Sequence, residues 1–389
     1  MEKFRRAWAE INLDNLRENC EMIHGLLKDD CAMLAVVKAN AYGHGDVEVA
    51  KEIADIVDGF AVSNMLEGRR LRRAGIRKPI LILGYTPATY AQDLFELNLI
   101  QTVVGMEYAR ELSEAASKAG VTLEVHMKVD TGMSRIGFSA VDSEKCIDDI
   151  EKACYLPNLK ATGIFTHFAV ADEETSKESV DFTELQHSRF SDVVYGLSKR
   201  GIEFERVHCC NSAAIISKPS YHHTMVRAGI IMYGAEPSST MLTSLPFKPV
   251  MALKSVVSMV KNLPAGETIS YGRKYKATEE MQVATVTIGY ADGYPRMLSN
   301  RGYAYVRDCV VPVVGAVCMD QLMLDVTGLD VHEGDIVTFF GGDSPISAAN
   351  LASMIGTINY EIFCGIGARV ERVYLKNGEE IKVVDYTTL

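Results

Sequence analysis

The feature that most constrains the fold is a unit that repeats through the first 240 residues. In each repeat a short run of β-branched and other apolar residues precedes a stretch whose apolar residues recur at helical spacing, as in 46–57, 107–118 and 178–199. Parallel strands covered by helices have this pattern. The strand-like runs lie near Met33–Val37, Gly59–Val62, Ile80–Leu83, Gln101–Val104, Leu123–Val129, Ala161–Thr166, Phe204–Cys209 and Met225–Val226. Eight units predict a closed TIM-type (β/α)8 barrel, because an open doubly wound sheet normally stops at about five to seven strands.

A second kind of sequence begins at about Pro249, where the helical periodicity fades and β-rich runs follow one another. Turn signals separate several of them, with Pro-Ala-Gly at 264–266, Asp-Gly at 292–293 and Lys-Asn-Gly at 376–378. The runs are Ala252–Val260, Gln282–Ile288, Ala304–Val306, Val310–Val314, Gln321–Val326, Ile336–Phe340 and Val370–Leu375. We therefore expect an α/β chain, with a barrel over residues 1–240 and a mainly antiparallel β domain over residues 241–389, connected through Glu236–Lys248.

Composition and charge exclude several classes of function. A formal net charge of −11 argues against a nucleic-acid partner, because such proteins concentrate Lys and Arg. No window approaches the roughly 18 apolar residues of a membrane span, and the first residues alternate charged and apolar character, unlike a secretory signal. We expect a cytoplasmic protein that acts on a small molecule and binds neither membrane nor nucleic acid.

Cysteine and histidine spacing gives no sign of a metal site. The nine cysteines are scattered, and an odd number in a long chain suits reduced thiols. His222–His223 is a pair without a third ligand at a sensible spacing, which is more typical of surface or structural residues. We expect no structural disulfide and no metal.

The residues that follow the predicted strands carry most of the chemistry. Because the active site of such a barrel lies at the carboxyl ends of its strands, these side chains should converge on one mouth. Lys38 follows the first strand, where partial desolvation suits an amine for Schiff-base chemistry, although a solvated loop lysine is the alternative. The other strand ends supply Lys128, Arg135, His167, Asn211, Ser212, Arg227, Gly229 and Ile230.

These segments resemble the alanine racemases, a pyridoxal-phosphate-dependent family that has a barrel and a β domain and that supplies D-alanine for bacterial peptidoglycan. The match covers most of the chain in family order, and its departures are minor, for instance Glu371 where the family often has proline. The matching segments are 36–45, 128–138, 166–169, 211–214 and 227–234 in the expected barrel, and 270–272, 289–294, 317–321 and 356–361 beyond it.

For the cofactor, the resemblance implies that Lys38 carries pyridoxal 5'-phosphate as an imine. Arg227 is then placed against the pyridine nitrogen. An arginine does not give up its proton at any working pH, so it donates a hydrogen bond and leaves that nitrogen unprotonated, which weakens the electron sink. A phosphate cradle is implied for Tyr42, Asn211, Ser212, the backbone of Gly229 and Ile230, and Tyr360. Ser212 and Gly229 are also compatible with simple turn residues, and Arg227 with an ion pair that closes the barrel.

For the reaction, the resemblance implies racemisation with a base on each face of the substrate carbanion. Lys38 is one base, and Tyr271, contributed by the partner subunit of a homodimer, is the other. His167 is implied as a supporting residue close to the cofactor, although a lone histidine beside Thr and Phe is often a core residue.

For the substrate, the resemblance assigns the carboxylate of a small amino acid to Arg135 and the backbone of Met319. Tyr290 and Tyr360 resemble the gate of a narrow access channel, and Lys128 is carbamylated in several family members. Alanine is the favoured substrate because Tyr360 narrows the site. Serine or another small amino acid remains an alternative, as does, less readily, an amino-acid decarboxylase of the same architecture.

Overall fold

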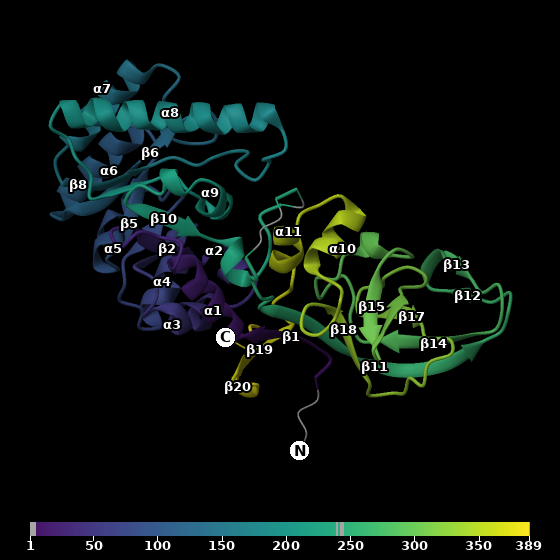
Figure 1. Cartoon of the computed structure of the whole chain (residues 1–389). Coiled ribbons are helices and arrows are strands. Elements are labelled where there is room, and N and C mark those ends of the chain that lie inside the picture. The colour runs from purple at the N-terminus through teal and green to yellow at the C-terminus, as the bar shows by residue number, and fades with distance from the viewer. Residues whose placement is uncertain (1–4, 239, 242–244, 389) are drawn as a thin grey trace.

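The computed structural model describes residues 5–238, 240–241 and 245–388. A helix-covered barrel stands at one end of the molecule and a β domain at the other, with two short helices, α10 (Ala348–Ile355) and α11 (Asn359–Cys364), between them (Figure 1). Among the described residues, no helix combines the length and the apolar character that a membrane crossing requires.

The barrel contains the eight predicted strands, and each hydrogen-bonds in parallel to its neighbour in the order β10-β2-β3-β4-β5-β6-β8-β9. Two backbone bonds, Thr224 N to Val207 O (3.2 Å) and Arg227 N to Cys210 O (3.1 Å), bring β9 against β10 and nearly close the ring. The strands are β2 (Ala32–Val36), β3 (Gly59–Val62), β4 (Ile80–Ile82), β5 (Ile100–Val103), β6 (Leu123–Asp130), β8 (Leu159–Phe165), β9 (Arg206–His208) and β10 (Met225–Ala228), with the short β7 (Phe138–Ser139) beside β6. The predicted barrel is confirmed.

Helices cover the outside of the barrel because their sequences bury one face. In α6 (Met106–Ala119), Tyr108, Leu112 and Ala116 repeat every four residues and are buried, and the helix ends at Gly120 in the left-handed conformation that glycine tolerates. The other helices are α1 (Leu13–His24), α3 (Asp46–Ile53), α4 (Met65–Arg73), α5 (Ala91–Glu96), α7 (Ser143–Cys154), α8 (Lys177–Lys199) and α9 (Ser212–Ser217). Short 3-10 turns are η1 (Ala88–Tyr90), η2 (Pro219–Tyr221), η3 (Ile230–Tyr233), η4 (Tyr271–Arg273) and η5 (Arg296–Leu298).

The β domain is mainly antiparallel, as predicted, and is built around the long strand β11, which pairs with β1, β14 and β18. The hairpin β19–β20 turns at Asn377 and Gly378, both with positive φ, which is the two-residue turn that the Lys-Asn-Gly signal predicts. The strands are β11 (Met251–Leu263), β12 (Thr268–Ile269), β13 (Tyr275–Lys276), β14 (Met281–Val286), β15 (Tyr303–Val306), β16 (Cys309–Pro312), β17 (Leu322–Asp325), β18 (Ile336–Phe340), β19 (Glu371–Lys376) and β20 (Glu379–Val384).

The first strand of the chain lies in this second sheet. β1 (Ala7–Asn12) pairs antiparallel with β11 and parallel with β19, although we assigned the whole of residues 1–240 to the barrel. Ala7, Trp8, Ala9 and Ile11 are all buried, so the strand is short and lacks a clear alternation that would separate it from the helix that follows. The expected connection Glu236–Lys248 includes residues 239 and 242–244, which lie outside the described residues, and the boundary at 240 stays a prediction.

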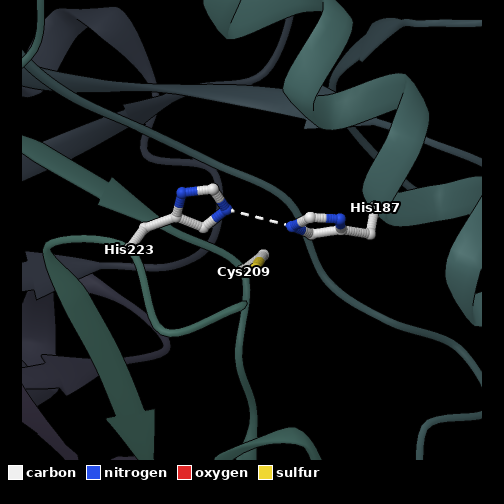
Figure 2. Close-up of side chains that lie close together, drawn as sticks. All are labelled: His187, Cys209 and His223. Atoms are coloured by element: carbon white, nitrogen blue, oxygen red, sulfur yellow. Dashed lines mark hydrogen bonds between the residues drawn. The ribbon is translucent and has the colours of Figure 1, made fainter. Parts of the chain in front are cut away.

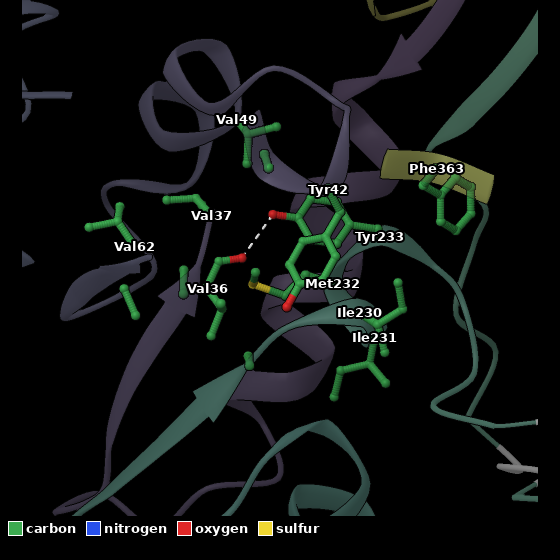
Figure 3. Packing of buried hydrophobic residues seen from close by; sticks show 14 of the residues in the cluster. Val36, Val37, Tyr42, Val49, Val62, Ile230, Ile231, Met232, Tyr233 and Phe363 are labelled. Atoms are coloured by element: carbon green, nitrogen blue, oxygen red, sulfur yellow. Dashed lines mark hydrogen bonds between the residues drawn. The ribbon is translucent and has the colours of Figure 1, made fainter. Parts of the chain in front are cut away.

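Tightly packed apolar and aromatic side chains support the mouth of the barrel (Figure 3). Tyr233 donates a hydrogen bond from Oη to the carbonyl of Val36 (3.0 Å), and its ring lies 5.2 Å from that of Tyr42 between centroids. Phe363 of α11 packs on His44 at 5.2 Å. Each such buried ring contributes about 1.5–3 kcal/mol, so the segment after β2 rests on a rigid base.

Candidate active site

A cavity of about 500 Å³ opens at the carboxyl ends of the barrel strands. It collects most of the residues that sequence analysis singled out, although they are scattered from β2 to α11. Those that line it are Lys38, Tyr42, Lys128, Arg135, His167, Asn211, Ser212, Arg227, Gly229, Ile230 and Tyr360. Tyr271, Tyr290 and Met319 are not among its lining residues.

Lys38 opens an unusual turn, α2 (Lys38–Tyr42), in which residues 39–42 all have positive φ of 52–55°. A left-handed conformation costs about 1–2 kcal/mol for each residue that is not glycine, so the turn persists only because its surroundings hold it. Glu67 accepts a hydrogen bond from the N–H of Ala39 (2.8 Å), and the Asn40 side chain accepts one from the N–H of Asp46 (3.1 Å). Burial, followed by the positive charge of Arg135, lowers the pKa of Lys38, which favours the neutral, nucleophilic amine.

Tyr42, Ser212 and Gly229 form a small polar cradle in the lining of the cavity. Ser212 Oγ accepts a hydrogen bond from the N–H of Gly229 (3.0 Å). A Cβ added at Gly229 would lie 3.1 Å from Tyr42 Oη and 3.3 Å from Ser212 Oγ, so only glycine leaves this space open. Asn211 caps α9 by accepting from the N–H of Ala214 (3.1 Å), which gives it a structural role besides its place in the lining.

Arg227 is a fully desolvated cation held by neutral groups. It donates from Nη1 and Nη2 to the carbonyl oxygens of Thr166 (2.8 Å), Cys209 (3.0 Å) and His208 (3.2 Å). The same two nitrogens donate to Nδ1 of His208 (2.8 Å) and of His167 (3.2 Å). Burial lowers the pKa of Arg227 to about 10, so the guanidinium remains charged at neutral pH. Among the described residues, none accepts a hydrogen bond from its Nε–H.

A chain of neutral histidines continues from Arg227. Because His208 accepts at Nδ1, its Nε2 carries the proton and donates to Nδ1 of His126 (3.0 Å). Burial, followed by the charge of Arg227, pushes the pKa of His167 and of His208 well below the usual range, and burial lowers that of His126 to about 3. The positive charge here therefore resides on Arg227, and His167 adds a neutral donor at Nε2.

Two further basic side chains reach the cavity. Lys128 is buried beneath it, and burial, followed by the charge of Arg227, lowers its pKa to about 7. Its Nζ donates to the carbonyl of Val129 (2.6 Å) and lies 5.5 Å from the centroid of the Phe165 ring. Arg135 is exposed at the rim, and within the described part of the chain no acidic side chain forms an ion pair with it. This geometry does not favour the ion-pair alternative for Arg135.

Tyr271, Tyr290 and Met319 gather at a separate place, which we call the tyrosine patch. Cys318 connects them, since its carbonyl accepts from the N–H of Tyr290 (3.0 Å) and its Sγ lies 3.5 Å from Ser270 Oγ. The three side chains are exposed, Tyr271 by 75%. β12 and β13, the strands on either side of Tyr271, lie at the end of the β domain away from the barrel (Figure 1). One chain thus carries the cavity and the tyrosine patch apart from each other.

Comparisons with known proteins agree over the whole length. Residues 11–237 match the family model described as "Alanine racemase, N-terminal domain", and residues 250–374 match "Alanine racemase, C-terminal domain". The chain belongs to the alanine racemase family. It is 42% identical over 388 residues to the alanine racemase of Clostridium novyi, covering 98% of each chain. Its structure superposes on that of alanine racemase from Clostridium difficile 630 with a TM-score of 0.93 at 41% identity, covering 98% of both chains.

Family membership makes this chain an amino-acid isomerase and sets the decarboxylase alternative aside. The architecture alone does not fix the amino acid. A histidine racemase from Leuconostoc mesenteroides superposes with a TM-score of 0.85 at 29% identity, covering 96% of this chain. The same architecture therefore occurs in racemases of more than one amino acid.

Sequence analysis missed several lining residues of this racemase-family cavity, including Leu83, Asp172, Ser238 and Cys364. Cys364 lies one helical turn after Tyr360 on α11, so helical spacing would have brought both to the same face had the helix been expected. Asp172 and Ser238 lie in loops and approach through a bond from Ser238 Oγ to the Asp172 carbonyl (3.0 Å). Nothing in the local sequence marks that contact.

Proposed function

We propose that this chain interconverts L- and D-alanine with pyridoxal 5'-phosphate, in a cytoplasmic homodimer whose active sites combine one barrel with the tyrosine patch of the partner subunit. The observation that carries the proposal is the division between the cavity around Lys38 and the exposed patch around Tyr271. The nine cysteines are free, which is compatible with a reducing compartment.

The residues of the cavity fit this cofactor. The space beside Gly229, bounded by the hydroxyls of Tyr42 and Ser212, suits a phosphate held by neutral groups. Lys38 provides an amine for covalent attachment, and Arg227 Nε–H provides a donor for the ring nitrogen. Pyridoxal phosphate, when bound, supplies an electron-withdrawing ring for the electron pair left at the substrate Cα. Arg227 keeps its proton throughout and so limits the strength of that withdrawal.

In the proposed reaction, one base removes the α-proton and the other delivers a proton to the opposite face. Lys38 Nζ approaches from the barrel side, and Tyr271 Oη of the partner subunit approaches from the other. His167 would donate from Nε2 to that phenolic oxygen, and the charge of Arg227, which donates to His167 Nδ1, would favour the phenolate. Arg135 at the rim, without an ion-pair partner among the described residues, would bind the substrate carboxylate, with the backbone of Met319 from the partner's patch as its counterpart.

Two features favour a small substrate. Tyr360 packs edge-on against Tyr42, with ring centroids 5.8 Å apart, and reduces the space beside Lys38. Tyr290 of the partner's patch would narrow access further. Serine differs from alanine by a single hydroxyl, which an apolar pocket rejects only weakly, so alanine preference depends on how closely Tyr360 fits.

Carbamylation of Lys128 belongs to the same proposal. With a pKa of about 7, a substantial part of the amine is unprotonated at neutral pH and can add to carbon dioxide, releasing one proton. The resulting carbamate anion would replace a buried cation close to Arg227 and Arg135. Incubation with ¹³C-bicarbonate should give one carbamate carbonyl resonance, which Lys128→Ala removes.

The decisive experiment is incubation of the purified protein with L-alanine in heavy water. We expect loss of optical activity together with exchange of the α-proton for deuterium, and a much slower reaction with L-histidine. Exchange without loss of optical activity would contradict a reaction at both faces, and faster turnover of another amino acid would contradict alanine as the substrate.

A further inference from the structure

A second group of chemically active side chains lies outside the cavity. His187 of α8, Cys209 directly after β9 and His223 close before β10 meet between the long helix and the barrel wall (Figure 2). Their ligand atoms, one ring nitrogen from each histidine and Cys209 Sγ, all lie within 4.8 Å of one another. The proposed reaction uses none of these three side chains.

The two histidine nitrogens lie at the separation that a tetrahedral cation requires, and the sulfur lies somewhat farther away. The two Nε2 atoms of His187 and His223 lie 3.3 Å apart. Two nitrogens that bind one tetrahedral zinc at about 2.0–2.1 Å lie about 3.3 Å apart, and a sulfur at about 2.3 Å lies about 3.6 Å from each nitrogen. Cys209 Sγ and the rings therefore need to approach one another by roughly 1.2 Å at most when the ion binds.

The surroundings hold the donors in place. The His187 ring stacks on Tyr221 with centroids 3.5 Å apart and an angle of 5° between the planes. Cys209 is buried, with Sγ 3.1 Å from the carbonyl of Tyr221.

From this cluster we infer that His187, Cys209 and His223 bind one Zn²⁺ ion, which clamps α8 to strands β9 and β10. Two imidazoles and a thiolate form a donor set that suits zinc over Mg²⁺ or Ca²⁺. Three protein ligands leave the fourth position for water, and the partial exposure of both histidines gives water access. The Cys209 carbonyl binds Arg227 (3.0 Å), so the clamp also steadies the strand end that holds this arginine.

This inference replaces the expectation of no metal site. Sequence analysis considered only the pair His222–His223 and set it aside, and in the structure His222 is buried and bonded through Nε2 to the carbonyl of Ile215 (2.9 Å). The ligands that join His223 lie 36 residues away at His187 and 14 residues away at Cys209, and no metal motif has that spacing. Only the packing of α8 against the barrel brings them together.

The test is titration of the dialysed holoprotein with Co²⁺, followed by difference absorption spectroscopy against the metal-free holoprotein. We expect one equivalent of Co²⁺ per chain to produce a thiolate-to-cobalt charge-transfer band together with the intense visible bands of tetrahedral cobalt, and Zn²⁺ to displace it. At a zinc concentration a hundredfold above Kd, the unfolding temperature should rise by at least about 2 °C.

Variants decide whether the ion occupies this cluster. Cys209→Ser should abolish the charge-transfer band, and His187→Gln and His223→Asn should each weaken binding at least about a hundredfold, since even outer-shell partners are worth about 10–100-fold. Asparagine suits position 223, where φ is +50°, and His187 is half-buried on a helix surface, so circular dichroism should show both variants folded. Cys309→Ser and His332→Gln, in the β domain, are matched controls that should bind normally.

Two results would overturn the inference. One is a native holoprotein that shows no saturable cobalt band at micromolar metal concentrations. The other is binding that survives unchanged in Cys209→Ser or in both histidine variants, which would place the ion elsewhere, for instance beside Cys364 in the cavity.

Discussion

The barrel mouth and the tyrosine patch are organised in opposite ways. Around Lys38, burial fixes the protonation of nearly every group, with Arg227 charged, His167 and His208 neutral and Lys128 close to its midpoint. At the patch, Tyr271 is 75% exposed. The cavity around Lys38 is surrounded by groups of the same chain that set its electrostatic potential. The exposed tyrosine patch lacks such surroundings until a second chain covers it. The comparison indicates that assembly, more than folding of a single chain, completes the catalytic site.

The largest expected effect comes from the barrel side. Lys38→Ala removes both the covalent attachment point and one base, and should lower racemisation by at least about 10⁴-fold, the upper range for a general acid–base group alone. The visible absorbance of bound cofactor should change, and borohydride reduction of the native protein should label only the peptide that contains Lys38. A label on another lysine would contradict the assignment.

Loss of the opposite base tests the patch. Tyr271→Phe keeps the ring but removes the hydroxyl and should lower turnover by about 10²–10⁴-fold, while cofactor absorbance stays native. Tyr195→Phe, an exposed tyrosine on α8, is the matched control and should be fully active. An active Tyr271→Phe variant would remove the patch from the reaction.

Mixing the two inactive variants sharpens the comparison further. After dissociation and random reassociation of equal amounts of Lys38→Ala and Tyr271→Phe, about half of the dimers are hybrids, each with one site that has both bases. About a quarter of all sites, and of native activity, should return. If subunit exchange is demonstrated by mass spectrometry and no activity returns, both bases belong to one chain.

A smaller effect is expected for the residue that sets pocket size. Tyr360→Ala enlarges the space beside Tyr42 and should raise the ratio of serine to alanine turnover by about tenfold. One additional small group on a substrate, such as the hydroxyl of serine, changes discrimination by roughly 10–200-fold. Tyr303→Ala, on β15 of the β domain, should leave that ratio unchanged. The ratio of kcat/KM values is the measurement, since lost packing lowers activity on both substrates.

The smallest effect concerns the left-handed turn. Ala39→Gly relieves about 1–2 kcal/mol of backbone strain and costs about 0.5–1 kcal/mol in unfolded-chain entropy, so it should raise the free energy of unfolding by about 0.5–1 kcal/mol. Ala115→Gly, in the regular helix α6, should lower it by about 1 kcal/mol. Denaturant unfolding of both variants measures the difference, and equal destabilisation would show that the turn is unstrained.

The sequence predicts local features well and distant contacts poorly. The barrel strands follow from their periodicity, and Lys38 is conspicuous because a strand end places it at the mouth. β1 was not predicted as a strand and was included with the barrel residues, since its six residues give a weak signal and their partners lie far along the chain. His187 was overlooked for the same reason. Its proposed role as a metal ligand depends on Cys209 and His223, which only tertiary packing brings near it.

The position of β1 has a consequence for synthesis of the chain. Ala7 is made long before its partner Ser255, and Trp8 long before its partner Glu371. At about 5–20 residues per second, β1 waits roughly 12–50 s for β11 and 20–70 s for β19, while the whole barrel is made in between. The barrel can therefore form before the β domain, which closes only after β19 has been made. Until then the nascent chain exposes an unpaired apolar strand, so chaperones that bind such segments should act on the N-terminus of this protein rather than on its barrel.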